Sequence, residues 1–197
     1  IDDDVIASVK NLTRRRHTPK KHPNNPLIVK DKPWEVNPYF RTSNFNVRHD
    51  PEDGLFKCWY TDFFRYFGIS KSKYGLDSLH SRHCYAQSKD GIHWEKPSLG
   101  QHFVDGHDTN SVFCHPPYQI VVCPSILLDE HETDPSRRYK VTYLFHSDPS
   151  TASDATGGHH ADGLSLAFSP NGIDWTPYEH NPVIPNWLGD VSIVTYD

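Results

Sequence analysis

The sequence predicts an all-β protein made of four-stranded antiparallel sheets that repeat along the chain, as the blades of a β-propeller do. Residues 83–94 read HCYAQSKDGIHW and residues 164–175 read LSLAFSPNGIDW, so that Ser, Gly, Ile and Trp recur 81 positions apart. Each copy also contains a strong hairpin signal, Asp-Gly or Asn-Gly, which favours a type I′ turn with positive φ at both central residues. A hairpin repeated at a long period indicates an array of sheets, each burying a face on its neighbour.

The composition agrees with many short strands joined by structured loops. Aromatic residues make up 13% of the 197 residues, and 16 prolines accompany them. No apolar run approaches the length of a membrane span, and a net charge of −5 argues against nucleic acid as a partner. Four cysteines are too few for a disulfide framework, and we expect Cys58 and Cys84 to be buried thiols. The compartment stays open, with a secreted or periplasmic location favoured over a cytoplasmic one.

Residues 1–24 are polar and basic, and they are expected to form a solvated N-terminal arm. The propeller part then covers residues 25–197. Its first blade occupies about residues 44–94, with strands expected at the ranges 45–49, 55–63, 82–88 and 91–94.

The second blade occupies about residues 108–175. Its strands are expected at the ranges 125–128, 139–146, 164–169 and 172–175. Asp50 and Asp129 then take like positions at the end of a first strand, and Asp197 fits as a third, so that residues 190–197 open a third blade. A short echo, Asn-Pro-x-Ile, stands at both 25–28 and 181–184.

Two blades and one strand cannot close a ring, because propellers use about four to eight blades and an open array leaves sheet edges exposed. We therefore expect the chain to be the N-terminal part of a longer protein. The remaining propeller blades are its expected partner, on another chain or further along this one.

These motifs resemble the five-bladed propeller glycoside hydrolases, a group that includes families 32, 43, 68 and 130. The resemblance rests on Ser-x-Asp-Gly-x-x-Trp at 88–94, on Asn-Pro-Val-Ile at 181–184 and on the Gly189-Asp190 pair that follows. The segments 54–60 and 134–140 also resemble bacterial proteins described as family-32-like or family-43-like. The Asn-Asp-Pro-Asn-Gly motif of family 32 is absent. Sialidase Asp-boxes fit less well, since they place one more residue between Ser and Trp.

The resemblance implies a glycosidase acting on an oligosaccharide or polysaccharide. Such enzymes place carboxylates where the innermost strands begin, and hydrolysis needs two carboxyl groups flanking the glycosidic bond. Asp190, Glu35 and Asp108 each precede a predicted inner strand or its approach, and we expect them to converge at the propeller axis as catalytic groups. The structural alternatives are a strand-entry Asp, a solvated loop Glu and an Asx-turn.

Four further residues are candidates for contacts with a sugar. Trp34 can stack on a sugar face, or it can be a packed core residue. His107, Asn110 and His146 can hydrogen-bond hydroxyl groups. No organic cofactor is expected, and no metal site, because the pair His159-His160 has no third ligand at a fixed spacing. The tryptophans Trp94 and Trp175 are expected to be largely buried between blades.

Two other functions are compatible with the pattern. A non-catalytic propeller that binds glycan or protein would keep the structural tryptophan hairpins and lose the carboxylates. A glycoside phosphorylase of the family 130 kind would need basic residues at the funnel, for which Arg41 and Arg48 are available.

Overall fold

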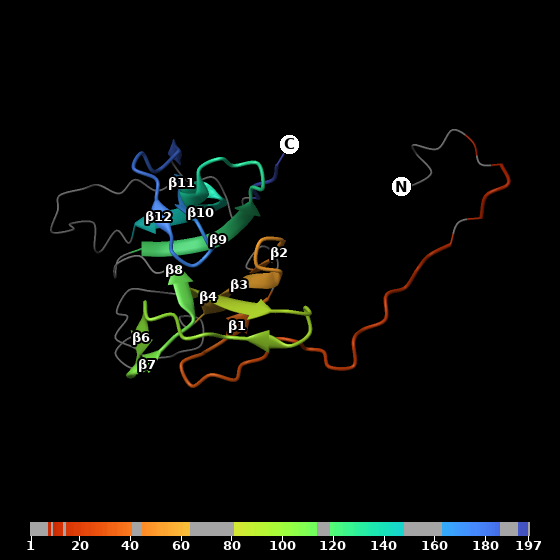
Figure 1. Cartoon of the computed structure of the whole chain (residues 1–197), viewed down its shortest axis with the longest axis horizontal. Helices are drawn as coiled ribbons and strands as arrows, with labels where there is room; N and C mark the ends of the chain where they lie inside the picture. Colours follow the sequence, from red (N-terminus) through yellow and green to blue (C-terminus); the bar gives the residue numbers. More distant parts are fainter. Residues whose placement is uncertain are drawn as a thin grey trace.

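The computed structural model describes residues 8, 10–13, 15–40, 45–63, 81–113, 119–147, 163–185 and 193–196. Within these ranges the chain forms two large antiparallel sheets that lie one above the other, and a separate two-stranded hairpin (Figure 1). The described residues contain no α-helix, and their one 3-10 turn, η4, covers Pro135–Arg137. None of them forms a helix that is long and apolar enough to cross a membrane. The all-β prediction is therefore confirmed.

Sheet 1 is formed by the first half of the chain. Its main path runs through β2 (Phe45–Asp50), β3 (Leu55–Phe63), β4 (Ser81–Ser88) and β5 (Trp94–Glu95). Two shorter strands complete it: β1 (Pro38–Tyr39) pairs with the end of β3, and β8 (Ser111–Phe113) pairs with the start of β4. A separate hairpin of β6 (Phe103–Val104) and β7 (His107–Asp108) stands between β5 and β8.

Sheet 2 repeats this order. It contains β9 (Gln119–Leu128), β10 (Tyr139–Ser147), β11 (Gly163–Ser169), β12 (Thr176–Pro177) and β13 (Ile184–Pro185). Strand β9 begins before the predicted Ser125, because the β-branched run 120–122 continues the pairing beyond an irregularity between Thr142 and Leu144. The described residues of 1–24 form no strand or helix, and Figure 1 shows this segment leading away from both sheets.

The two sheets share one pairing register. Cys58 pairs with Ala86 in sheet 1, and Val141 pairs with Ala167 in sheet 2, 81 positions after Ala86. By this register Val141 is the equivalent of Cys58. The first hairpin of each sheet contains the same ion pair. Lys57 Nζ lies 2.7 Å from the Asp50 carboxylate in sheet 1, and Lys140 Nζ lies 2.8 Å from the Asp129 carboxylate in sheet 2. The like positions predicted for Asp50 and Asp129 are confirmed. The peptide bonds Asn25-Pro26 and Asn181-Pro182 are both cis.

The repeated turn differs from the type I′ turn that was expected. Gly91 and Gly172 have positive φ, at 74° and 79°, but Asp90 and Asn171 do not. In sheet 1, the Ser88 hydroxyl accepts hydrogen bonds from the backbone N–H groups of Asp90 and Gly91. The Asp90 side chain accepts from the two N–H groups that follow Gly91. These side chains satisfy a longer loop, so the expected strand 91–94 is reduced to β5.

The sheets bury a common core. Sheet 1 contributes Trp59, Tyr85 and Val112, and sheet 2 contributes Ile126, Tyr139, Val141, Tyr143 and Ala167. The indole N–H of Trp59 donates to the carbonyl oxygen of Gly172 over 2.7 Å. A Cβ added at Gly172 would lie 2.4 Å from Cζ2 of the Trp59 ring. Glycine is therefore required at residue 172 both for its positive φ and for the close approach of this ring.

Hydrogen bonds between β2 and β9, the first long strands of the two sheets, also join the sheets. The Asn46 side chain accepts from the N–H of Ile126 over 3.1 Å and donates to the carbonyl of Pro124 over 2.8 Å. Ser125 occupies the equivalent position in sheet 2, because it pairs with Thr142 as Asn46 pairs with Trp59. Its hydroxyl accepts from the N–H of Val194 over 3.0 Å.

A buried charge cluster lies at the edge of the shared core. The Asp50 carboxylate is 1% exposed, and it accepts hydrogen bonds from Lys57, Arg138 and the Tyr139 hydroxyl. Burial alone would raise the pKa of Asp50. The hydrogen bonds from Arg138, Lys57 and Tyr139 outweigh it and hold this pKa far below its usual range. Arg138 and Tyr139 belong to sheet 2, so this cluster links the two sheets.

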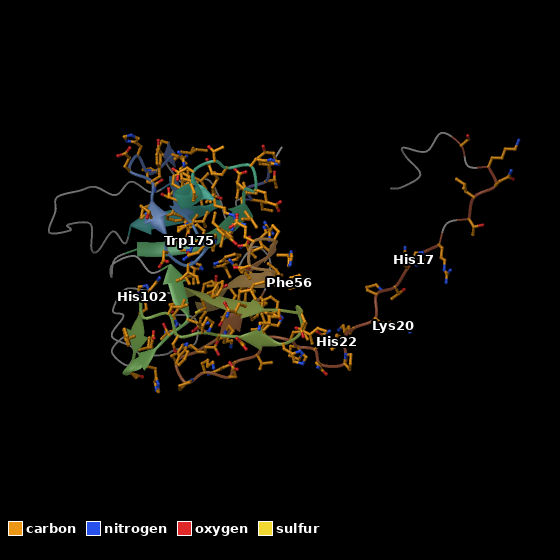
Figure 2. The ribbon with its side chains drawn as sticks, in the orientation of Figure 1. His17, Lys20, His22, Phe56, His102 and Trp175 are labelled. Atoms are coloured by element: carbon orange, nitrogen blue, oxygen red, sulfur yellow. The ribbon has the colours of Figure 1, made fainter. Side chains whose placement is uncertain are left out.

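The repeated tryptophans are less buried than expected. Trp94 and Trp175 are both half-buried, and each indole N–H donates to the glycine carbonyl of its own turn. Trp175 packs against the shared core and lies where the two sheets meet (Figure 2). Trp94 packs on the opposite face of sheet 1, beside the buried thiols Cys58 and Cys84. Each indole closes its own turn, so neither tryptophan is inserted fully between the sheets.

We predict that Gly172→Ala destabilises the chain more than Gly91→Ala, by roughly 1–3 kcal/mol, because both glycines have positive φ but only Gly172 contacts a neighbouring sheet. Gly91 is the matched control, since its nearest atom is a Phe56 ring carbon at 3.9 Å. Urea unfolding of the 197-residue chain measures the difference. Equal losses in the two variants would contradict the Trp59 contact.

We predict that Asp50→Asn costs roughly 2–5 kcal/mol near neutral pH, because it removes the buried anion that Lys57 and Arg138 share. Their other partners, Asp53 and Glu52, are much more exposed to solvent. The folded-state pKa of Asp50 is lowered, so this stabilisation is complete above the ordinary carboxyl pKa of about 3.9 and is lost as the pH falls below it. The difference between the parent and the variant should therefore stay constant from about pH 7 to about pH 5 and shrink as the pH falls below about 4. Asp129→Asn, at the more exposed equivalent pair, should cost less. A pH-independent difference would contradict the assignment.

Candidate functional site

A buried polar cluster surrounds Glu35, ahead of the first strand of sheet 1. Glu35 is 2% exposed. One carboxylate oxygen accepts from the Tyr60 hydroxyl over 2.8 Å and from Lys96 Nζ over 2.7 Å. The other accepts from Lys96 and from the backbone N–H groups of Asp31 and Lys32, over 2.8, 3.0 and 3.1 Å. This geometry excludes the alternative of a solvated loop Glu.

Trp34 and Asn110 are part of the same cluster. The Trp34 indole N–H donates to Asn110 Oδ1 over 3.0 Å. The Asn110 amide donates to the Tyr60 hydroxyl and to the Tyr85 carbonyl, each over 2.8 Å. The exposed ring of His107 lies against Trp34, with centroids 5.9 Å apart. The structure therefore brings Glu35 and Asn110 together on the Tyr60 hydroxyl, with Trp34 bonded to Asn110 and His107 beside Trp34.

The Tyr60 hydroxyl links the carboxylate to the amide. Burial raises the pKa of Tyr60, and the nearby Glu35 carboxylate raises it further. The phenol therefore stays protonated, donates to Glu35 and accepts from Asn110. Lys96 also lies over the Tyr60 ring, 5.7 Å from its centroid.

A second buried ion pair lies beside this cluster and was not predicted. Asp62 and Arg82 are 0% and 2% exposed, and their charged groups are 2.8 Å apart. Asp62 also accepts from the N–H groups of Val36 and Asn37, which fixes the entry to β1. The register of β3 and β4 places Asp62 directly opposite Arg82, so the hairpin register contained the signal for this pair.

Asp108 has a separate environment on the β6–β7 hairpin. It is half-buried, and its Oδ1 accepts from the N–H of Gly100 over 2.8 Å. Phe103 is its partner across the hairpin and is 64% exposed. His102, at the base of this hairpin (Figure 2), has its pKa lowered by burial, and its carbonyl accepts from Thr109.

Two predicted site residues cannot be compared with this geometry. Asp190 lies outside the described residues, and His146 is within β10 but its side chain lies outside the described part. The convergence of Asp190, Glu35 and Asp108 therefore stays a prediction. Within the described residues, no group of three or more His, Cys, Asp or Glu side chains could hold a metal ion.

The cluster favours recognition and rigid support over proton transfer at Glu35. Five hydrogen bonds already reach the two oxygens of Glu35, so this carboxylate has its lone pairs occupied within the protein. The exposed group beside the cluster is the His107 ring. Asp108 lies on the separate β6–β7 hairpin, and its Oδ2 has no partner among the described residues.

Comparisons with known proteins give partial structural similarities. No protein-family profile and no curated protein matches the chain. A fructofuranosidase from Schwanniomyces occidentalis, solved with fructose, is 18% identical over 71% of this chain and 23% of its own, with a TM-score of 0.44. A glycosyl hydrolase from Bacteroides ovatus is 20% identical over 73% of this chain and 32% of its own, with a TM-score of 0.35. An N-acetylgalactosamine deacetylase from F. plautii, in complex with blood group B trisaccharide, is 15% identical over 71% and 30%, with a TM-score of 0.36.

The chain thus spans about a quarter to a third of each of these proteins. The comparison finds structural similarity to glycoside hydrolases over part of their length. No residue role follows from similarities of this extent.

We predict that Lys96→Met costs roughly 3–5 kcal/mol, because it leaves the Glu35 carboxylate buried without its cation. The double variant Lys96→Met with Glu35→Gln should recover much of this loss, since a neutral amide needs no cation. Urea unfolding of the parent, both single variants and the double variant measures the coupling. A loss below about 0.5 kcal/mol for Lys96→Met, or a double variant as unstable as the sum of the single ones, would contradict the pair.

Proposed function

We propose that sheets 1 and 2 are consecutive blades of a five-bladed β-propeller that acts on carbohydrate. The support is the common register, the repeated Lys–Asp pair and the face-to-face packing of the two sheets. The bond from Val194 to Ser125 repeats the bond from Ile126 to Asn46, which favours a third blade beginning in the predicted range 190–197.

The proposed activity is glycoside hydrolysis by paired carboxylates where the inner strands begin. The observation that supports this activity is the buried polar cluster around Glu35, ahead of the first strand of sheet 1. There Glu35, Asp62, Arg82 and Lys96 are buried with their charges paired, although buried ions are costly to keep. Such a cluster is a rigid support for a site above it.

Within this proposal Asp190 and Asp108 are the carboxylates that exchange protons or attack the sugar. Glu35 is retained as a candidate, but its engaged oxygens favour a positioning role: it holds Tyr60 and, through it, Asn110. Trp34 supports the exposed His107 ring from beneath, and His107, Asn110 and His146 are proposed to contact sugar hydroxyls.

The non-catalytic binding propeller is the second candidate, and one observation favours it. The fully paired Glu35 leaves one fewer carboxylate free for chemistry than the sequence led us to expect. The phosphorylase alternative is less favoured, because Arg48 already donates to the carbonyls of Val47 and Ile126. Arg41 lies outside the described residues.

We predict that the full-length protein releases sugar from at least one member of a glycan panel, detected by product analysis. Asp190→Asn and Asp108→Asn should each lower kcat/KM by orders of magnitude with folding retained, because each removes a charge and a proton while keeping the shape. Glu35→Gln should act mainly through stability. Full activity in Asp190→Asn and Asp108→Asn would exclude the catalytic assignment. Glycan binding without any turnover would favour the binding propeller.

A further inference from the structure

The face of sheet 1 turned away from sheet 2 carries an apolar groove of about 640 Å³. Its lining includes Val47, Cys58, Gly91 and Trp94, and the segment around Leu27 forms one wall. Val47 is 39% exposed there, although valine is a typical core residue.

The repeat shows what fills the same position in sheet 2. Val47 pairs with Cys58 as Ile126 pairs with Val141, so Ile126 is the equivalent of Val47. Ile126 is only 3% exposed, because sheet 1 covers it. The groove of sheet 1 is thus the counterpart of a surface that is covered in sheet 2.

The group that covers the sheet 2 surface is the Trp59 indole. Its N–H donates to the Gly172 carbonyl, which also accepts from Trp175 over 3.1 Å. In sheet 1 the Gly91 carbonyl accepts from Trp94 over 3.0 Å, and it has no second donor among the described residues. The space that Trp59 fills beside Gly172 is correspondingly open beside Gly91, where a Cβ would meet only the Phe56 ring at 3.9 Å.

We infer that this groove is the seat of a β-sheet from outside residues 1–197, and that this sheet presents a tryptophan whose indole N–H donates to the Gly91 carbonyl. An indole supplies both the apolar area and the donor that the groove requires.

The charges describe the partner further. At the sheet 1–sheet 2 contact, Arg138 and Tyr139 bind Asp50. Their equivalents in sheet 1 are Leu55 and Phe56, because Phe56 pairs with Ser88 as Tyr139 pairs with Ser169. A carboxylate of the partner at the position of Asp50 would meet no cation from sheet 1. The partner therefore has an apolar residue at this position, or a carboxylate paired with a cation of its own.

A second copy of this chain does not meet these requirements. Its sheet 2 would present Thr142, the equivalent of Trp59, since Thr142 pairs with Leu166 as Trp59 pairs with Tyr85. Threonine is too small to fill the space of an indole. The Trp59 face of a second copy is already covered by its own sheet 2.

The inference rests on the repeat of the two sheets and is independent of hydrolase activity. The test labels cysteine variants with a maleimide, in the 197-residue chain and in the full-length natural polypeptide. Val47→Cys should react readily in the 197-residue chain and at least about tenfold more slowly in the full-length protein, because the seated sheet must open first. Phe103→Cys, exposed on the separate β6–β7 hairpin, is the control and should react alike in both.

The second test introduces Gly91→Ala and Gly172→Ala separately into both proteins and measures the midpoint of urea unfolding. In the 197-residue chain Gly91→Ala should shift the midpoint less than Gly172→Ala, and in the full-length protein the two shifts should be equal. Equal labelling of Val47→Cys in both proteins would overturn the inference. If the slow labelling of Val47→Cys disappears on dilution, the groove is covered by a second copy. If labelling is slow but Gly91→Ala is still tolerated, no tryptophan lies beside Gly91. Either result would also overturn the inference. An inactive full-length protein that passes these tests would refute the proposed hydrolase and leave this inference standing.

Discussion

The indole of Trp59 joins the two sheets, because its ring is almost fully buried and its N–H finds an acceptor only on the other sheet. Two rings flank it, Tyr85 from sheet 1 and Tyr139 from sheet 2, each with centroids 5.8 Å away. The apolar residues of the two sheets are buried against each other around this contact, so each sheet depends on it. The charge cluster at Asp50 fixes the orientation of the two sheets, since Arg138 and Tyr139 of sheet 2 reach Asp50 of sheet 1 only when the sheets are stacked in this way.

This contact explains the form of the repeated turn. A carbonyl that accepts from two indoles must point outward from a turn with no side chain in the way, and Gly172 with its positive φ meets both conditions. The dipeptides Asn-Gly and Asp-Gly correctly indicated a chain reversal. Their physical role is wider than a hairpin turn, because the serine and the Asx side chain hold a loop that receives the neighbouring sheet.

Much of the fold could be predicted, because the strands carry local signals. The ranges 55–63 and 164–169 alternate buried and exposed side chains or are rich in aromatic residues, and both form strands as expected. The candidate site was harder. Trp34 and Asn110 are 76 positions apart, and no local pattern indicates that they meet. The buried state of Glu35 depends on Lys96, which is 61 positions away and carries no motif of its own. Such pairs are set by how β1 and the segment after β5 fold onto sheet 1.

The central claim is that Trp59 is the contact on which the stacking of the sheets depends. Hydrogen exchange of the tryptophan indole N–H groups, followed by NMR in increasing denaturant, tests it most directly. We expect the Trp59 indole to exchange only by global unfolding, so that its exchange rate tracks the free energy of unfolding. The half-buried Trp94 and Trp175 should exchange by local opening of their own turns, with little dependence on denaturant. A Trp59 indole that exchanges as fast as that of Trp94 would contradict the account.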